Sequence, residues 1–153
     1  MNTAPAEPRN DVERLLQELM MSDSVQFRVD SSDGLFVVWL QGGRTPGPNC
    51  SPENWWAAAA TDWHVMVKYA AIKQVRFVRE PDGHFPERDS LSVRFVGATP
   101  GAALSADFQP LYDDWNRPKT ALFSRWEELR ARYGAGQVEV TVENGRLLTP
   151  VGR

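Results

Sequence analysis

The chain has 153 residues, a length that fits one domain burying roughly 70% of the surface of its unfolded chain. Hydrophobic residues make up 42% of it and aromatic residues 10%, which supplies a core and excludes a largely disordered chain. The net charge of −3, with 20 acidic and 17 basic residues interspersed, excludes the basic surface expected of a nucleic-acid-binding protein.

The single cysteine and the N-terminal composition suggest a cellular compartment. Cys50 cannot form an internal disulfide, and no metal-site spacing surrounds it. The N-terminal segment lacks the apolar core of a signal peptide, and no stretch approaches the length of a membrane span. We therefore expect a cytoplasmic protein with no membrane span.

The first predicted element is a helix that follows an N-terminal tail. Residues 1–9 are rich in proline, alanine and glutamate, so we expect a flexible tail there and a single domain over residues 10–153. Asn10 or Asp11 is the candidate N-cap, and the helix should end near Ser22. Helical spacing predicts a buried stripe of Val12, Leu15, Leu16, Leu19 and Met20 and an outward face of Glu13, Arg14, Gln17 and Glu18.

Two strand-like segments come next, Ser24–Asp30 and Leu35–Leu40, with a Ser-Ser-Asp-Gly turn between them. The first segment alternates apolar and polar residues, whereas the second is apolar throughout. This pattern predicts a hairpin whose second strand is covered on both faces. Residues 41–54 then form a long loop rich in glycine and proline, a kind of loop that is usually functional or disordered.

The middle of the chain predicts an antiparallel meander. Residues 55–61, with four consecutive alanines, are compatible with a helical turn or a strand. Alternation of apolar and polar residues then predicts strands joined by short turns over 62–69, 72–79, 90–96 and 102–108. After a loop over 109–117, a helix is expected with Pro118 at its first position and Gly134 at its end, burying Ala121, Leu122, Trp126, Leu129 and Tyr133.

The last predicted element is a hairpin of residues 137–143 and 146–149. Its turn, Asn144-Gly145, is a strong signal for a two-residue hairpin loop. The whole pattern amounts to about seven strands and two or three helices. It predicts an α+β fold with helices around a mostly antiparallel sheet, open or partly closed into a barrel.

The sequence contains no motif that by itself indicates catalysis. Gly42-Gly43 lacks the lysine and the following helix of a phosphate-binding loop, and no nucleophile elbow occurs. With one cysteine and two histidines, a structural zinc site would need carboxylates for most of its ligands. These features favour a binding protein over an enzyme.

The polar faces of the predicted strands carry the residues best suited to a ligand. If the strand registers align, one surface collects an imidazole, a thioether, a hydroxyl and three guanidinium groups, from His64, Met66, Ser92, Arg28, Arg76 and Arg94. The same set is ordinary for a solvated sheet face, and both interpretations stay open. As a concave face it would suit an anionic small ligand, or an anionic metal macrocycle with His or Met on the iron and Arg on the carboxylates. His84, in the turn PDGHFPERD, is interpreted as a solvated loop residue.

The stretch from His64 to Gly134 resembles the haem-iron utilisation superfamily of HemS/ChuX/HutX-like proteins. The matching segments, in chain order, are HVMVKYAAIKQVRFVRE, SLSVRFVG, AALSADF and SRWEELRARYG. The resemblance implies a split-barrel-like core with flanking helices, and a homodimer that binds haem in the cytoplasm for trafficking or storage of haem or iron. It implies His64 as the iron ligand. The shared-face argument adds Arg76 and Arg94 as partners of the haem propionates, with Met66 and Arg28 completing the predicted cofactor site.

Two other functions stay open. Split barrels also host flavin- or haem-dependent oxidoreductases, which would need a phosphate cradle that this sequence could build only from scattered arginine, serine and threonine residues. A non-catalytic interaction domain is the second alternative. It would use exposed tryptophans such as Trp55, Trp56 and Trp115 as anchors for a partner protein.

Overall fold

The structure is a computed structural model that describes residues 7–31, 33–45, 53–60, 63–99, 101 and 103–149. Its helices are α1 (Asp11–Met21) and α2 (Thr120–Gly134), with a short 3-10 turn, η1 (Tyr69–Ala71). No helix in the described ranges is long and apolar enough to cross a lipid bilayer. The strands in chain order are β1 (Val25–Asp30), β2 (Val37–Gln41), β3 (Trp56–Ala60), β4 (Trp63–Val67), β5 (Ile72–Pro81), β6 (Asp89–Gly97), β7 (Ala103–Phe108), β8 (Glu139–Glu143) and β9 (Arg146–Leu148).

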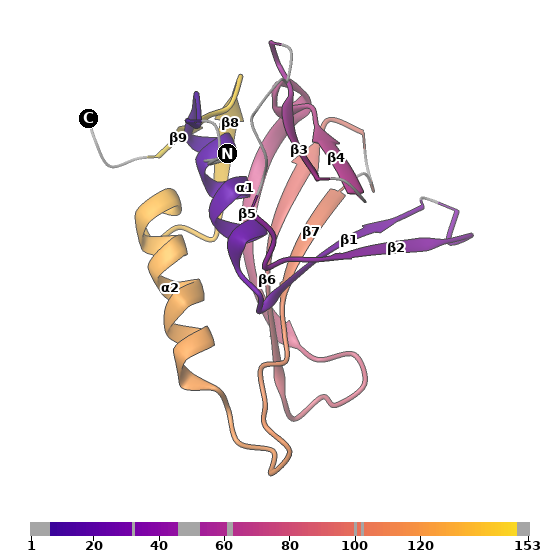
Figure 1. Cartoon of the computed structure of the whole chain (residues 1–153). Coiled ribbons are helices and arrows are strands. Elements are labelled where there is room, and N and C mark those ends of the chain that lie inside the picture. The colour runs from indigo at the N-terminus through magenta and orange to yellow at the C-terminus, as the bar shows by residue number, and fades with distance from the viewer. Residues whose placement is uncertain are drawn as a thin grey trace.

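Seven strands form one antiparallel sheet in the order β2-β1-β7-β6-β5-β8-β9, and β3 and β4 pair in a separate two-stranded sheet. The predicted α+β class is confirmed, including the meander of β5, β6 and β7. Among the described residues no pairing joins β2 to β9 at the two ends of the large sheet, so the sheet is open and does not close into a barrel. Both helices lie on the same side of this sheet (Figure 1).

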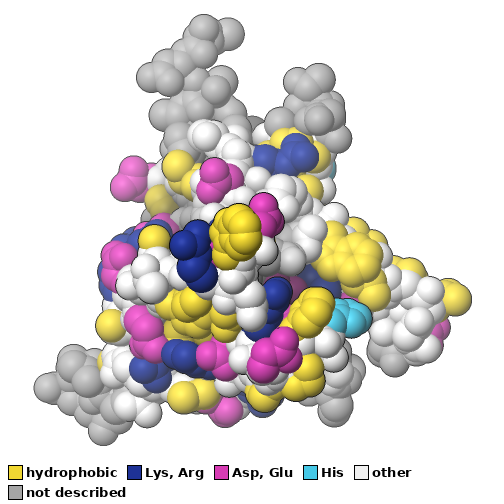
Figure 2. Space-filling view, turned by 90° about the horizontal axis from the view of Figure 1, so that it is seen from below, with side chains coloured by type: hydrophobic (Ala, Val, Ile, Leu, Met, Phe, Trp, Pro, Cys, Tyr) yellow, Lys and Arg dark blue, Asp and Glu magenta, His cyan; other side chains and the backbone are white. Residues whose placement is uncertain are grey.

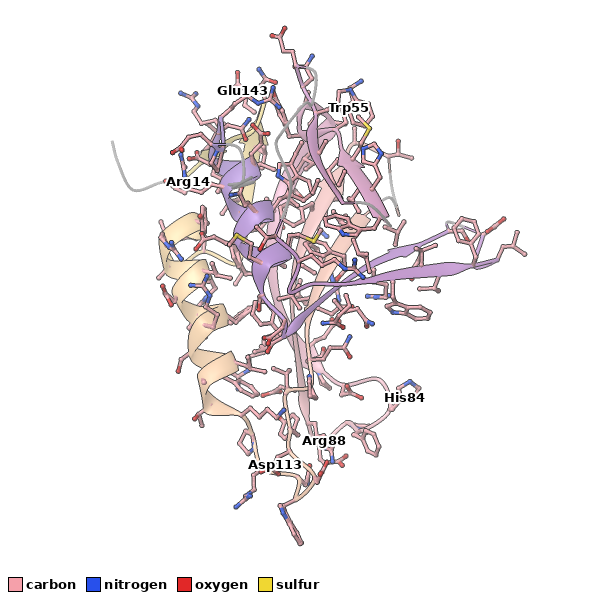
Figure 3. All side chains as sticks on the ribbon, viewed as in Figure 1. Arg14, Trp55, His84, Arg88, Asp113 and Glu143 are labelled. Atoms are coloured by element: carbon pink, nitrogen blue, oxygen red, sulfur yellow. The ribbon has the colours of Figure 1, made fainter. Side chains whose placement is uncertain are left out.

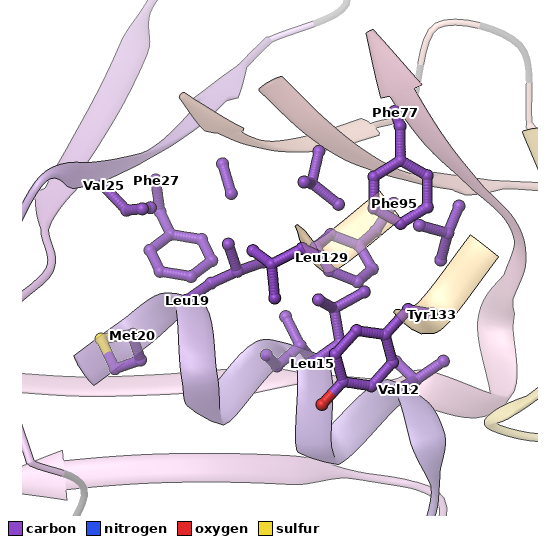
Figure 4. Packing of buried hydrophobic residues seen from close by; sticks show 14 of the residues in the cluster. Val12, Leu15, Leu19, Met20, Val25, Phe27, Phe77, Phe95, Leu129 and Tyr133 are labelled. Atoms are coloured by element: carbon purple, nitrogen blue, oxygen red, sulfur yellow. The ribbon is translucent and has the colours of Figure 1, made fainter. Parts of the chain in front are cut away.

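The strand register separates an apolar face of the sheet from a polar face. Phe77, Val93, Ala106 and Phe27 are cross-strand neighbours on four adjacent strands, and all four are buried. Figure 4 shows side chains of this face packed with the apolar residues of α1 and α2. Successive side chains of a strand point to opposite faces, so the residues directly before and after each of these four along its strand belong to the polar face. The candidate site lies on that polar face.

Helix α1 confirms its predicted buried stripe but buries one residue more. Asn10 is the N-cap, and its side chain accepts a hydrogen bond from the Glu13 backbone N at 2.9 Å. Glu13 was expected to face outward, yet it is 0% exposed. Its carboxylate turns back to Arg9 and accepts from the Arg9 Nε at 2.8 Å and the Arg9 backbone N at 3.1 Å. Arg9, expected as the end of a flexible tail, is thus docked; residues 1–6 of that tail lie outside the described part of the chain.

The first turn of α1 rests on the C-terminal hairpin. The Val12 backbone N donates to the Gly145 carbonyl at 3.0 Å, and the Leu147 backbone N donates to the Asp11 carboxylate at 3.1 Å. Asn144 and Gly145 both have positive φ angles, 47° and 82°, as a two-residue hairpin turn requires. The predicted hairpin is confirmed, and it also serves as the docking point for α1.

The prediction that the second strand of the hairpin, β2, is covered on both faces is wrong. The exposed fractions of β2 include 55% for Val38 and 55% for Trp39, and Leu35, just before the strand, is 79% exposed. The hairpin of β1 and β2 extends away from the body of the molecule (Figure 1). We call its outer part, residues 29–31 and 33–39, the arm. A continuous apolar run reads the same whether a strand is buried on both faces or exposed on both, so the sequence could not separate the two cases.

The ambiguous segment 55–61 contains a strand. β3 pairs antiparallel with β4, and its Trp56 and Ala58 are buried in the core, which overrides the helical preference of the alanines. The glycine- and proline-rich loop expected over 41–54 is described only at its two ends, and residues 46–52 lie outside the described ranges.

Helix α2 begins at Thr120, two residues later than expected, because Pro118 instead forms a β-bridge with Tyr112. Trp126, Leu129 and Tyr133 are buried as predicted. The other two members of the predicted stripe differ, since Leu122 is half-buried and Ala121 is exposed.

Candidate functional site

A row of polar residues crosses the open face of the large sheet. Arg28 of β1 pairs in register with Ser105 of β7, Ser105 with Arg94 of β6, and Arg94 with Arg76 of β5. At the end of the row, Trp39 of β2 is the cross-strand partner of Arg28. The expectation that the arginines would share a face is therefore met by the observed register.

A groove of about 800 Å³ lies over part of this row. Its floor comes from the sheet, and one wall includes Trp39 of the arm. The opposite wall is the β5–β6 connection, whose His84 and Arg88 lie below the β1–β2 hairpin in Figure 3. The groove is lined by residues of four stretches of the chain, among them Gln26, Arg28, Trp39, Glu80, Asp82, His84, Phe85, Arg88, Ser92, Arg94, Asp107, Pro110 and Tyr112.

The two arginines on the floor are held by carboxylates. The Arg28 Nε donates to Asp107 at 2.9 Å and its Nη1 to Asp30 at 2.6 Å. Burial opposes the charge of Arg28, but the hydrogen bond and charge of Asp107, assisted by Asp30, outweigh it and raise the pKa of Arg28 above its usual value. The Arg94 Nη2 donates to Glu80 at 2.6 Å. Both guanidinium groups are therefore held in place by carboxylates.

The charges around the groove nearly cancel. Its lining includes three arginines, Arg28, Arg88 and Arg94, and four acidic residues, Glu80, Asp82, Asp89 and Asp107. Figure 2, a view of the end of the molecule that carries the β5–β6 connection, shows basic, acidic and hydrophobic side chains intermixed. The groove therefore offers a ligand specific hydrogen-bond donors rather than a strong positive field. One such donor, the buried Nε of Arg94, has no hydrogen-bond partner among the described residues.

The β5–β6 connection is a well-formed turn. The Asp82 side chain accepts hydrogen bonds from the backbone N of Phe85 at 2.9 Å and of His84 at 2.8 Å, and these bonds lower the pKa of the Asp82 carboxyl group. The Arg88 guanidinium lies 4.5 Å from the centre of the Phe85 ring and 5.2 Å from that of Tyr112. The turn thereby holds the exposed His84 at the rim of the groove.

The predicted site residues do not all meet. Arg28, Arg94 and Ser92 line the groove together. Arg76 is next to Arg94 in the row but lies outside the groove, where its Nη2 donates to Gln74 at 2.9 Å. His64 and Met66 are on the outward face of β4, in the separate two-stranded sheet, and both are exposed. The alternation of apolar and polar residues correctly predicted which residues of β4 share a face, but it carries no information about which sheet β4 joins.

Trp39 and His84 are among the groove residues that the sequence did not predict for the site, and His84 was expected only as a solvated loop residue. Both reach the site through tertiary structure, His84 from a turn and Trp39 from the arm. The tryptophans proposed as anchors divide into three cases. Trp56 is buried, Trp55 is half-buried with the Lys68 ammonium 5.9 Å from its ring centre, and Trp115 is 80% exposed.

Comparison with known proteins does not assign this chain to a family. No family model matches it, and no curated protein matches it.

Proposed function

We propose that this chain is a non-catalytic binding protein that holds haem, or another flat ligand bearing carboxylates, in the groove. The observation that carries the proposal is the joint presence of two fixed guanidinium groups, an exposed imidazole and an indole around one cavity, from Arg28, Arg94, His84 and Trp39. The resemblance of residues 64–134 to haem-utilisation proteins supports haem as the first ligand to test.

The spacing of the two arginines suits a ligand with two carboxylates. Arg28 and Arg94 are in register with one strand between them, so their Cα atoms are roughly 10 Å apart. Arg28 keeps its bond to Asp107, whereas its second partner Asp30 and the Arg94 partner Glu80 are 50% and 47% exposed, and ion pairs of such exposure contribute at most about 1 kcal/mol. A ligand carboxylate can therefore replace either partner at little cost.

The walls of the groove suit a flat aromatic ligand. Trp39 is 55% exposed and Phe85 is 50% exposed, so both rings have area left for stacking. The volume of about 800 Å³ falls within the range of roughly 300–1,000 Å³ that small-molecule sites occupy. His84 is the imidazole that could bind iron from this wall, whereas His64, the ligand expected from the resemblance, would hold haem on a different surface.

A haemin titration followed by visible absorption tests this proposal. We expect a saturable Soret band that is shifted or weakened in His84→Ala and weakened in Arg94→Gln, with His64→Ala as the matched control that leaves it unchanged. A band lost only in His64→Ala would instead support the site on β4. A wild-type protein that gives no saturable Soret change would overturn haem binding. No observation on the described residues favours a flavin- or haem-dependent oxidoreductase over a non-catalytic binding protein.

An interaction domain is the second candidate, and the arm favours it. Monomeric soluble proteins rarely expose a contiguous apolar patch of this kind unless another molecule covers it. Leu35, Val37 and Trp39 alternate along the arm and are 79%, 38% and 55% exposed.

A further inference from the structure

We propose that two copies of this chain associate through their arms, with the β2 strand of one copy pairing antiparallel with the β2 strand of the other. This inference concerns a different surface from the ligand groove, although Trp39 borders both. It does not require that a ligand binds.

The arm exposes apolar side chains on both of its faces. Leu35, Phe36 and Trp39 are 79%, 54% and 55% exposed, although aromatic and leucine side chains are normally among the most buried. Neighbouring residues of a strand point to opposite faces, so neither face of the arm is covered. The remaining exposed apolar residues are Val29, Val37 and Val38.

The backbone of β2 is also unpaired along one edge. β2 is the last strand of the sheet order, so within the described ranges it pairs only with β1. The Phe36 carbonyl accepts from the Ser31 backbone N at 2.9 Å, and the Gly42 backbone N donates to the Val25 carbonyl at 2.8 Å. Because hydrogen bonding alternates along a strand, the even-numbered residues of β2 face β1. The N–H and C=O groups of Val37, Trp39 and Gln41 therefore point to the open edge, where the Gln41 carbonyl already accepts from the Arg44 Nε at 3.2 Å.

A second copy of the same strand is the occupant that the charges favour. From Gly34 to Gly43 the chain carries no charged side chain and no proline, the features with which proteins usually protect an edge strand. Two such segments can lie side by side without like-charge contacts. Asp33 precedes the segment and Arg44 follows it, so antiparallel pairing brings the acidic end of one copy to the basic end of the other.

The outward-facing backbone groups restrict the register to pairs of odd-numbered residues. A two-fold axis at Val38 meets this condition for Val37 and Trp39. Beyond them, the Leu35 backbone N already donates to the Asp33 carboxylate at 3.0 Å, and the Gln41 carbonyl already accepts from the Arg44 Nε at 3.2 Å. Val37 then lies opposite Trp39, and Phe36 lies opposite Leu40. Pairing along this edge brings the exposed side chains of β2 next to the same side chains of the other copy, and such cross-strand apolar neighbours stabilise a sheet.

Sedimentation velocity over a range of protein concentrations, without haemin, is the first test. We expect a concentration-dependent dimer for the wild type and a monomer for Val38→Lys, since a lysine at the axis would place two like charges in contact. Val138→Lys is the matched control, because Val138 is 59% exposed, outside the arm, and should leave the dimer intact. Thermal melts show that each variant is folded. A monomeric wild type, or a dimer that persists in Val38→Lys, overturns the proposal.

Disulfide cross-linking tests the register in a Cys50→Ser background. The two Val38 residues form a pair without mutual hydrogen bonds, with Cα atoms about 4.5 Å apart, a distance that a disulfide can span. Val38→Cys should therefore give a covalent dimer under mild oxidation. Leu35→Cys is more exposed but lies roughly 20 Å from its copy in this register, and it should stay monomeric on reducing-agent-free gels. Equal cross-linking of both variants would show random collision and reject the pairing. Both assays are independent of the Soret titration, so either proposal can fail alone.

Discussion

Glu13 shows how a charge in the core depends on a single residue outside its helix. Its carboxylate is 0% exposed and receives the Arg9 Nε at 2.8 Å and the Arg9 Nη2 at 3.0 Å. Arg9 reaches further, to the Trp55 carbonyl and to a position 5.6 Å from the centre of the Tyr69 ring. The Arg9 guanidinium thus neutralises the Glu13 carboxylate and ties α1 to the segment that leads into β3.

Removing Arg9 should destabilise the protein far more than its position near the N-terminus suggests. Arg9→Ala leaves the Glu13 carboxylate buried and without its ion-pair partner, which costs roughly 3 kcal/mol of unfolding free energy. Urea denaturation measures the loss. Arg14→Ala is the control, because Arg14 pairs with Asp11 at the surface and should cost less than about 1 kcal/mol. Similar losses for the two variants would show that Glu13 is solvated in solution.

At the scale of elements, α1 and α2 are joined by a cluster of polar groups around Glu18. Its carboxylate accepts from the Tyr133 hydroxyl and from the Nη2 groups of Arg125, at 3.1 Å, and Arg132, at 2.9 Å. Burial opposes the charge of Glu18, but the Tyr133 hydrogen bond and the two arginines outweigh it, so the pKa of Glu18 lies below its usual 4.5. Burial, together with the same carboxylate, raises the pKa of Tyr133.

The lowered pKa makes the helix–helix contact sensitive to acid. A carboxyl group whose pKa is lower in the folded state stabilises that state above pH 4.5, and the contribution is lost as the pH falls through the lowered pKa. We therefore expect Glu18→Gln to be less stable than the wild type at pH 6, with a difference that shrinks towards pH 3. Urea titrations at several pH values measure it. Glu127→Gln, at a more exposed pair with Arg130, should show a much smaller pH dependence.

At the scale of the whole molecule, one core is shared by the helices and the large sheet. Trp126 of α2 is 3% exposed, its ring centre lies 6.5 Å from that of Phe77, and its Nε1 donates to the Ser92 carbonyl at 3.0 Å. It therefore packs against the sheet and bonds to the strand that also carries Arg94.

Trp126→Ala should weaken the whole fold in one step. Loss of the buried ring costs roughly 3–5 kcal/mol, and because the core is shared, thermal unfolding should remain a single transition at a lower temperature. Circular dichroism melts provide the measurement. Trp115→Ala removes an equally large but 80% exposed side chain and should change the melting temperature by about a degree or less. Two separate transitions in Trp126→Ala would show that α2 is not part of the shared core.

The sequence predicts local structure here much better than it predicts tertiary neighbours. Alternation of apolar and polar residues located β5, β6 and β7, and it placed Arg28, Arg76 and Arg94 on one face because strand periodicity fixes that face. The same alternation could not show that His64 belongs to a different sheet. Nor could it show that a turn brings His84 to the groove, because that contact depends on the path of the chain between elements.

The docking of α1 on the C-terminal hairpin has a consequence for the order in which the chain folds. Asp11 and Leu147, which share a hydrogen bond, are 136 residues apart in the sequence. During synthesis α1 emerges well before the hairpin that holds its first turn, so its apolar face is made before these neighbours are present. Contacts of such long sequence separation also slow folding, because the loop must close before they form. The first turn of α1 therefore cannot reach its native contacts until the β8–β9 hairpin has been synthesised and folded.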